Sequence, residues 1–273
     1  MKRLTGSLLL SLSCFSAAIL RADALNVLGT ANGFAVLGAS AVTNTGSTVL
    51  GGNLGVAPGS SVTGFLPGIV VTGVNHGNDG VAIQAHQDAL TGYSVLAGLP
   101  FTSNLTGQDL GGMLLLPGVY FFSSSAQLTG ALTLDFEGLS DQSFVFQTGS
   151  SLTTASGSMV NVINRGLNDS VYWQVGNSAT LGTTSAFQGS ILADQSISLT
   201  TGATILCGNA LAMHGAVAVT LDTNVIGACE TVETTGPGTG PGTITQTPEP
   251  GTLPLLAPGA LGAAGAIRPR WMR

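Results

Sequence analysis

The chain has 273 residues, of which only 7% are charged, and its formal net charge is −6. Six of its seven basic residues lie near the two ends, which leaves Arg165 as the one basic residue of the central region. We therefore expect no nucleic-acid binding, because that function needs many cations to neutralise phosphates. The 40 glycines, with frequent Thr, Ser and Val, are typical of many short strands joined by tight turns.

Residues 1–24 have the pattern of a signal peptide. A short positive segment (Lys2, Arg3) precedes the apolar run LTGSLLLSLSCFSAAIL, and Ala22-Asp23-Ala24 is a small-x-small cleavage site. We expect cleavage after Ala24 and export, so that the protein is secreted or associated with the cell surface. The alternatives are a membrane anchor, for which the run is shorter than the roughly 20 residues of a span, and a lipoprotein modified at Cys14.

Residues 25–229 are expected to form one domain, and one segment of it has a helical pattern. Asn78 or Asp79 can cap the start of this helix, and Pro100 stops it. We predict a helix at about 80–98 whose apolar stripe packs against a flat surface, with His86 at the surface or edge. The stripe is formed by Ala82, Ala85, Ala89, Tyr93 and Leu96.

After Pro100 the pattern is one of strands, and it repeats at about 20 residues. Each of the segments LTTAS, ATLGT, LTTGAT and VTLDT carries one hydroxyl residue and a second one three or four positions later. Such a repeat predicts a β-solenoid, whose stacked coils align outward side chains in ladders about 4.8 Å apart. A β-sandwich is the competing fold, but it explains neither the repeat nor the single helix. The hydroxyl residues are Thr153, Ser156, Thr180, Thr183, Thr200, Thr201, Thr204, Thr220 and Thr223.

Long blocks between Leu25 and Ile226 follow one another in the order of a known family. They include SAVTNTGSTVLGGNLGVAPGSSVTGF, VYWQVGNSATLGTTSAFQGSILA and ISLTTGATILCGNALAMHGAVAVTLDTN. These blocks resemble the microbial ice-binding (antifreeze) proteins. The resemblance implies a mainly β fold, an irregular right-handed β-solenoid with triangular cross-section and one long α-helix packed alongside. A Thr-(Ala/Gly)-x-(Thr/Asn) motif of some members has matches at Thr45–Thr48, Thr72–Asn75 and Thr201–Thr204.

The resemblance also implies one flat face that adsorbs to ice, and the nine hydroxyl residues above are the candidates for it. Threonine offers a hydroxyl and a methyl group on a stiff stem, so that little rotamer freedom is lost on binding. Charged side chains would have to lose tightly held water. We expect the partner of a monomeric chain to be an ice crystal surface whose growth or recrystallisation it inhibits. This mechanism needs no cofactor, metal or enzymatic activity.

Two other functions are compatible with a secreted β-solenoid. A polysaccharide lyase or glycoside hydrolase needs paired carboxylates; the closest pair, Asp135 and Glu137, is expected to cap a turn. A cell-surface adhesin or glycan-binding module remains the alternative, because export suits it equally. Sugar binding commonly uses exposed aromatic side chains, whereas Tyr120, Tyr172 and Trp173 are expected in the core or against the helix.

The two cysteines that remain after export, Cys207 and Cys229, are expected to form a disulfide in an oxidising compartment. Zinc binding is disfavoured because no His or Cys lies at ligand spacing beside either residue.

The chain ends in two further segments. Residues 230–247 form a Gly/Pro/Thr linker, and residues 248–273 contain Pro248-Glu249-Pro250, an apolar stretch and three arginines. This last segment resembles the PEP-CTERM sorting signal of Gram-negative bacteria, which implies an exosortase-type sorting enzyme as a partner. The alternative is a disordered tail with a sticky end.

Overall fold

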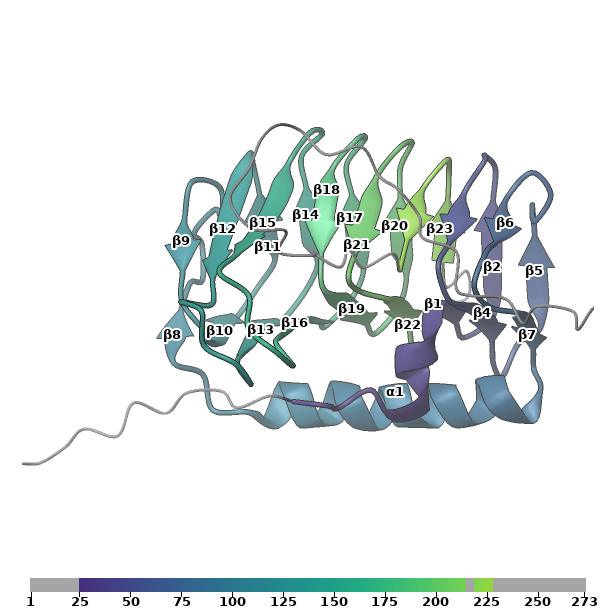
Figure 1. The fold of residues 1–273 in the computed structure, drawn as a ribbon, viewed down its shortest axis with the longest axis horizontal. Coiled ribbons are helices and arrows are strands. Elements are labelled where there is room, and N and C mark those ends of the chain that lie inside the picture. The colour runs from purple at the N-terminus through teal and green to yellow at the C-terminus, as the bar shows by residue number, and fades with distance from the viewer. Residues whose placement is uncertain (1–24, 215–218, 228–273) are drawn as a thin grey trace, which may run out of the picture. The chain divides into compact units, whose positions relative to one another are not determined.

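A computed structural model describes residues 25–214 and 219–227. The predicted signal peptide, Cys229, the linker and the sorting tail lie outside these residues. Within them the strands form three parallel sheets, which we call sheets 1, 2 and 3, with nine, seven and eight strands (Figure 1). The chain passes from sheet 1 to sheet 2 to sheet 3 and back to sheet 1, so that each circuit makes one coil. The structure thus confirms the predicted β-solenoid.

Each sheet contains one strand from almost every coil. In spatial order, sheet 1 consists of β7 (Asn75–Gly77), β4 (Asn53–Val56), β1 (Phe34–Gly38), β22 (Ala210–Ala212), β19 (Ser190–Ala193), β16 (Ser170–Val175), β13 (Ser143–Thr148), β10 (Gly118–Phe122) and β8 (Ser103–Asn104). Sheet 2 consists of β11 (Ala126–Leu128), β14 (Leu152–Thr154), β17 (Ala179–Leu181), β20 (Ile197–Leu199), β23 (Val219–Leu221), β2 (Ala41–Asn44) and β5 (Ser61–Thr63). Sheet 3 consists of β6 (Ile69–Val70), β3 (Val49–Leu50), β24 (Val225–Ile226), β21 (Thr204–Leu206), β18 (Ala186–Gln188), β15 (Met159–Ile163), β12 (Ala131–Asp135) and β9 (Leu114–Leu115).

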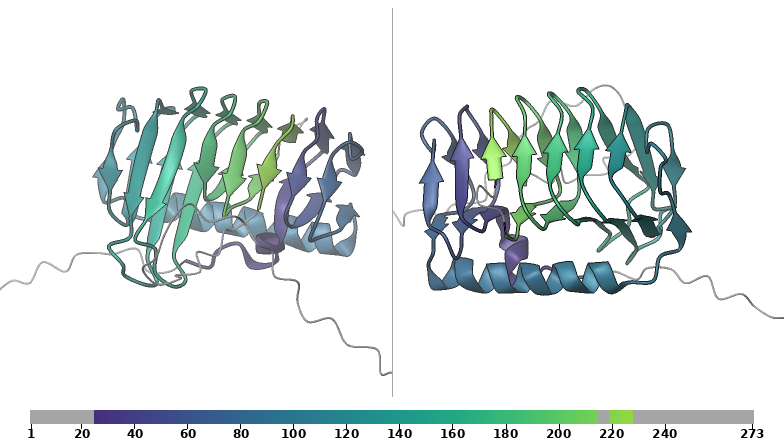
Figure 2. Two further views of the ribbon diagram at one scale, coloured as in Figure 1. Left: turned by 45° about the horizontal axis from the view of Figure 1, so that its top comes forward. Right: turned by 180° about the vertical axis from the view of Figure 1, so that it is seen from behind.

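The order of the coils in space differs from their order in the chain. The first coil (β1, β2, β3) pairs on one side with the second coil (β4, β5, β6) and on the other side with the last coil (β22, β23, β24). The long helix carries the chain from the second coil to the opposite end of the solenoid, where β8 begins the return. The last coil therefore joins the two halves, and Figure 2 shows this joint from two further directions.

The interior of the coils is filled by alternate side chains from all three sheets. An aromatic stack lies near the middle of the column, where the rings of Phe146 and Trp173 are 3.9 Å apart and nearly parallel, with Phe187 beside them. Trp173 is fully buried, and its indole N–H donates to the carbonyl of Gln188. A continuous apolar column of this kind stabilises the stacking of each coil on the next.

The helix α1 (Gly80–Gly98) covers the outer face of sheet 1, as predicted. The carboxylate of Asp79 caps its first turn by accepting hydrogen bonds from the amides of Val81 and Ala82. At its other end, the Gln147 side chain donates to the carbonyls of Leu96 and Leu99, at 2.7 and 2.8 Å. A short 3-10 helix, η1 (Gly29–Gly33), packs against α1. No helix of the described residues is long and apolar enough to cross a membrane.

One prediction about the helix was wrong. His86 is only 8% exposed, and its Nδ1 is buried without a hydrogen-bond partner in the described part of the chain. The residue lies three or four positions from Ala82 and Ala89, which also face the sheet. Its position in the helix therefore places it in the buried stripe, and this position determines its burial despite the polarity of the ring.

Candidate functional site

Only two of the three sheets present their outer faces to solvent. The outer side chains of sheet 1 are buried with those of α1 in a second apolar cluster, which includes Val119, Val145, Tyr172, Leu192 and Leu211. Sheets 2 and 3 have no such cover in the described residues, and their outward side chains are partly or fully exposed. Any flat docking surface on the side of the solenoid is therefore on sheet 2 or sheet 3.

The outer face of sheet 2 carries a continuous column of hydroxyl side chains. In five of its strands (β11, β14, β17, β20 and β23) the first and last side chains are buried and the middle one points outward, as in Ala179-Thr180-Leu181; in β2 and β5 the outward residues are Thr43 and Thr63. These outward residues pair directly from strand to strand, without a register shift. We call this set the central column; in spatial order it is Gln127, Thr153, Thr180, Ser198, Thr220, Thr43 and Thr63.

The side chains of the central column have no hydrogen-bond partner among the described residues. None of the seven forms a side-chain hydrogen bond to any other described residue. As far as the described residues go, their polar groups are therefore left to hydrogen-bond with surrounding water. Each of the five Thr residues also carries a methyl group beside its hydroxyl, so that the column combines polar and apolar groups.

A second line of small residues runs parallel to the central column, two positions earlier in each coil. The backbone pairing continues through this line, since the amides of Ala126, Leu152 and Ala179 donate to the carbonyls of the next coil. We call it the serine line; its described members are Ser125, Ser151, Ser178, Ser196, Ala41 and Ser61. In this line the hydroxyls do contact one another, and Ser196 donates to Ser178 at 3.0 Å.

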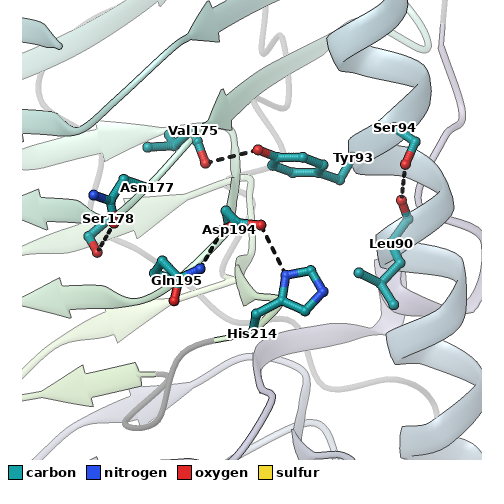
Figure 3. A network of polar contacts seen from close by, with 9 residues as sticks. All are labelled: Leu90, Tyr93, Ser94, Val175, Asn177, Ser178, Asp194, Gln195 and His214. Atoms are coloured by element: carbon teal, nitrogen blue, oxygen red, sulfur yellow. Dashed lines mark hydrogen bonds and ion pairs between the residues drawn. The ribbon is translucent and has the colours of Figure 1, made fainter. Parts of the chain in front are cut away.

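The serine line borders a polar network at the corner between sheets 1 and 2 (Figure 3). Ser178 donates to the side-chain oxygen of Asn177, and the Nδ1 of His214 lies 2.9 Å from a carboxylate oxygen of Asp194. The Tyr93 hydroxyl reaches this corner from α1. The network fixes the edge of the face on the helix side.

The central column and the serine line form a regular grid. Strands lie about 4.8 Å apart and alternate residues of one strand about 6.6 Å apart. The seven strands of sheet 2 therefore extend the grid over about 29 Å. Along its other edge a third line contains Thr200 and Thr45, whose hydroxyls are taken up by the backbone carbonyls of Leu181 and Leu221.

Charge is almost absent from this face. Asp222, at the edge next to sheet 3, is the one carboxylate of the three lines, and it accepts hydrogen bonds from Thr201 and Thr223. The only Lys or Arg of the described residues, Arg165, follows β15 at the corner between sheets 3 and 1. A surface of this kind can dock onto an uncharged lattice without stripping tightly held hydration water from ions.

The outer face of sheet 3 is also regular but mainly apolar. A line of outward residues pairs in register from β12 to β6. Its members are Ala131, Met159, Ala186, Thr204, Val225, Val49 and Ile69. Met159, Val225 and Ile69 are 40%, 36% and 47% exposed. This line has a single hydroxyl, that of Thr204, which lies 3.5 Å from the carbonyl of Ser185.

The structure distributes the nine candidate residues over four places. Thr153, Thr180 and Thr220 belong to the central column, and Thr200 lies two positions beyond it. Ser156, Thr183, Thr201 and Thr223 are exposed in the turns between sheets 2 and 3, and Thr204 lies on sheet 3. The motif matches do not mark one face either, because Thr48 is fully buried and bonded to Asn44.

Four members of the central column were missed by the sequence analysis. Ser198, not Thr200, is the column member of β20, and Thr43 and Thr63 belong to the coils before α1, outside the predicted repeat. A sequence pattern identifies these positions: an apolar residue that is buried, then an outward hydroxyl residue, then a residue that is buried or lies in a turn. It occurs as Val42-Thr43-Asn44 and Ile197-Ser198-Leu199; in β11, Gln127 takes the hydroxyl position.

Several residues outside the face that could suggest another function have a structural role. The Asp135 carboxylate accepts from the amide of Glu137 and from Asn164, which confirms the predicted turn cap. Trp173, Tyr120 and Tyr172 are at most 8% exposed, as expected for core and helix-packing residues. Cys207 is disulfide-bonded. In the described part of the chain, no three His, Cys, Asp or Glu residues are placed to hold a metal ion.

Comparison with known proteins links this arrangement to one family. The family described as Ice-binding-like matches residues 36–227. An ice-binding protein of Nostoc sp. strain HG1 is 50% identical over 255 residues, which are 93% of this chain and 90% of that protein.

Solved structures agree with the family match. The crystal structure of an ice-binding protein from an Antarctic biological consortium is 41% identical and superposes with a TM-score of 0.68, covering 73% of this chain and 89% of that one. The ice-binding protein of the ascomycete Antarctomyces psychrotrophicus is 38% identical with a TM-score of 0.67, covering 73% of this chain and 96% of that one.

Proposed function

This chain belongs to the Ice-binding-like family, and we propose that it binds ice through the outer face of sheet 2. The observation that carries the choice of face is the central column: seven outward side chains in unbroken register, six of them hydroxyls, and none bonded to another described side chain or backbone group.

The geometry explains how such a face meets ice. The hydroxyls of the central column hold water at fixed spacings, and the methyl groups between them limit the other orientations that this water can take. The ordered water then merges with the crystal. Because the strands are locked into the solenoid and the Thr side chains have restricted χ1, little conformational entropy is lost on adsorption.

Adsorbed protein inhibits ice growth and recrystallisation without any chemical step. Ice can advance only between the bound molecules, and the curved front that results is harder to extend. We propose that one chain acts as a monomer, because the grid of about 29 Å is complete within a single solenoid.

The face assignment is tested by tyrosine substitutions on the two exposed sheets. Ser198 lies on the middle strand of sheet 2, and Thr204 lies on the fourth strand of sheet 3. A tyrosine reaches about 4 Å further than either residue, which exceeds the roughly 2.8 Å of one hydrogen bond to water. Ser198→Tyr should therefore abolish most thermal hysteresis and ice shaping by the mature chain, whereas Thr204→Tyr should retain both.

Melting curves of both variants serve as the folding control. Loss of activity in Thr204→Tyr together with full activity in Ser198→Tyr would move the docking surface to the apolar line of sheet 3. Absence of ice shaping by the unsubstituted chain would overturn ice binding itself.

We also propose, from the sequence pattern alone, that residues 1–24 direct export and that residues 248–273 are recognised by an exosortase-type enzyme of a Gram-negative bacterium. The secreted or cell-surface location follows from these two signals. Mass spectrometry of the exported protein tests both, since it reports the first and last residues that remain after processing.

A further inference from the structure

The first described residue is held in place by the fold. The backbone nitrogen of Leu25 donates to the hydroxyl of Ser143 at 3.2 Å, and its carbonyl oxygen accepts from the hydroxyl of Tyr172. Ser143 is fully buried and contacts the hydroxyl of Ser170 at 2.9 Å. Leu25 also packs against the apolar cluster beneath α1. These contacts fix the position of its nitrogen atom.

This nitrogen lies beside a polar cavity of about 450 Å³. The walls come from the N-terminal segment, from η1, from the turn before β13 and from the start of β16. The lining residues are Leu25, Asn26, Asn32, Asp141, Asn168, Asp169, Ser170 and Tyr172. The cavity is at the corner between sheets 3 and 1 and does not include any member of the central column or the serine line.

The cavity has an excess of negative charge. Asp141 and Asp169 both line it, whereas Arg165 lines a neighbouring cavity that shares Asp169. The Asp169 oxygens accept from the amides of Gln142 and Gly166, and Asp141 accepts from Asn168, so that no cation is hydrogen-bonded to either carboxylate in the described residues. One further positive charge would neutralise this corner.

We propose that this cavity receives the α-ammonium group that forms when the chain is cleaved after Ala24. Hydrolysis of the Ala24–Leu25 bond consumes one water molecule and leaves a carboxylate on Ala24 and an amine on Leu25, which is protonated below pH of about 7.7–8.0. One N–H of the ammonium retains the bond to Ser143, and the other two are available to the cavity that Asp141 and Asp169 line. Maturation thereby adds an ion pair that the uncleaved chain lacks.

The inference rests on the proposed cleavage site and not on ice binding. An uncleaved chain has a neutral amide at this position, with a single donor. The ammonium has three donors and a charge, and its two acidic neighbours are partly screened by solvent. In this proposal the processed end of the chain is a specific part of the fold.

The test compares two forms of the mature chain, residues 25–273 and residues 24–273, which differ by one alanine. The form that begins at Leu25 should melt about 2–4 °C higher at pH 6–7. Carboxylates raise the pKa of the amine, so the added stability is complete below the amine's unfolded pKa and is lost as the pH rises through its folded pKa. The difference in melting temperature should vanish near pH 10.

Two substitutions locate the effect. Asp169→Asn should reduce the difference in melting temperature between the two forms, whereas Asp194→Asn, at the opposite corner of sheet 1, should leave it unchanged. The Leu25 amine should also react about tenfold more slowly with an amine-specific acylating reagent than the Ala24 amine, since a rise of one unit in pKa lowers the reactive fraction tenfold. This second measurement needs no variant.

Equal melting and equal acylation of the two forms would overturn the proposal, as would an exported protein whose first residue is not Leu25. Thermal hysteresis should be the same for both forms, because the cavity is separate from the central column. A failure of the ammonium site is in this way distinguished from a failure of ice binding.

Discussion

The methyl and hydroxyl groups of the central column can be separated by substitution. We consider two triple variants of Thr153, Thr180 and Thr220, in which all three become Val or all three become Ser. Val keeps the methyl group and the stiff branched stem, and Ser keeps the hydroxyl. All three positions are on the strands that define the column, and their side chains have no bonding partner within the described protein.

The structure gives the size of each effect. Removal of one buried methyl group costs about 0.8 kcal/mol, so the Ser variant loses at most about 2.4 kcal/mol, or roughly 50-fold in adsorption. The Val variant loses hydroxyls that form hydrogen bonds to ice. Because the same hydroxyls form hydrogen bonds to liquid water before adsorption, their net contribution to adsorption is small, and their removal leaves no protein group unpaired. We therefore expect adsorption of the Val variant to ice to weaken by less than about tenfold.

Thermal hysteresis at matched concentrations and partition of the protein into a growing ice hemisphere measure this difference. The melting temperatures should change little, because exposed substitutions of this kind are worth less than about 0.5 kcal/mol. If the Val variant were the weaker of the two, hydrogen bonding by hydroxyls and not the stiff methyl grid would govern adsorption, and the reasoning above would be refuted.

Three further predictions follow from other parts of the structure. Ice adsorption should be insensitive to added salt once the freezing-point depression is subtracted, since the central column has no charges to screen; a collapse at moderate ionic strength would contradict the neutral grid. Reduction of the Cys207 disulfide, which we expect to join Cys229, should lower the stability by about 2–4 kcal/mol in thermal melts and leave ice shaping intact in the cold; two free thiols in the unreduced protein would remove this idea. Burial and then the neighbouring His214 lower the pKa of His86, so the unfolded chain binds more protons and stability should fall as the pH drops below about 6.5. His86→Leu should flatten this dependence in melts between pH 5 and 7.5, and an unchanged slope would show that other groups cause it.

The elements that could be predicted from the sequence are those with a strong local pattern. The helix was found because Ala82, Ala85 and Ala89 repeat at helical spacing and Asp79 and Pro100 mark its limits. The solenoid was found because the triplets around Thr153, Thr180 and Thr220 recur. In both cases the physical cause is periodic burial, which the sequence records directly.

The face was harder to predict, because a hydroxyl residue is equally common on a strand and in the turn that follows it. Thr180 and Thr183 look alike in the sequence, yet one lies on sheet 2 and the other in a turn toward sheet 3. Turn hydroxyls often bond to local backbone, as that of Thr184 does to the carbonyl of Thr183. Only the alternation of buried neighbours distinguishes the two settings.

The pairing of the first and last coils had no local signal at all. The register of Thr43 with Thr220 joins residues 177 positions apart, and it depends on where α1 returns the chain. Such long-range order is determined by the fit of whole coils, which no window of sequence contains.

The position of the last coil has a consequence for the order of synthesis. Thr43 and Thr63 are made early and the row from Gln127 to Ser198 later, yet the two groups are connected only through Thr220. A nascent chain that ends before β23 carries two short, separate rows, and neither spans the grid. The proposed docking surface is complete only when the last coil pairs with the first coil on one side and with β20 on the other, so a chain that ends before β23 lacks the continuous column.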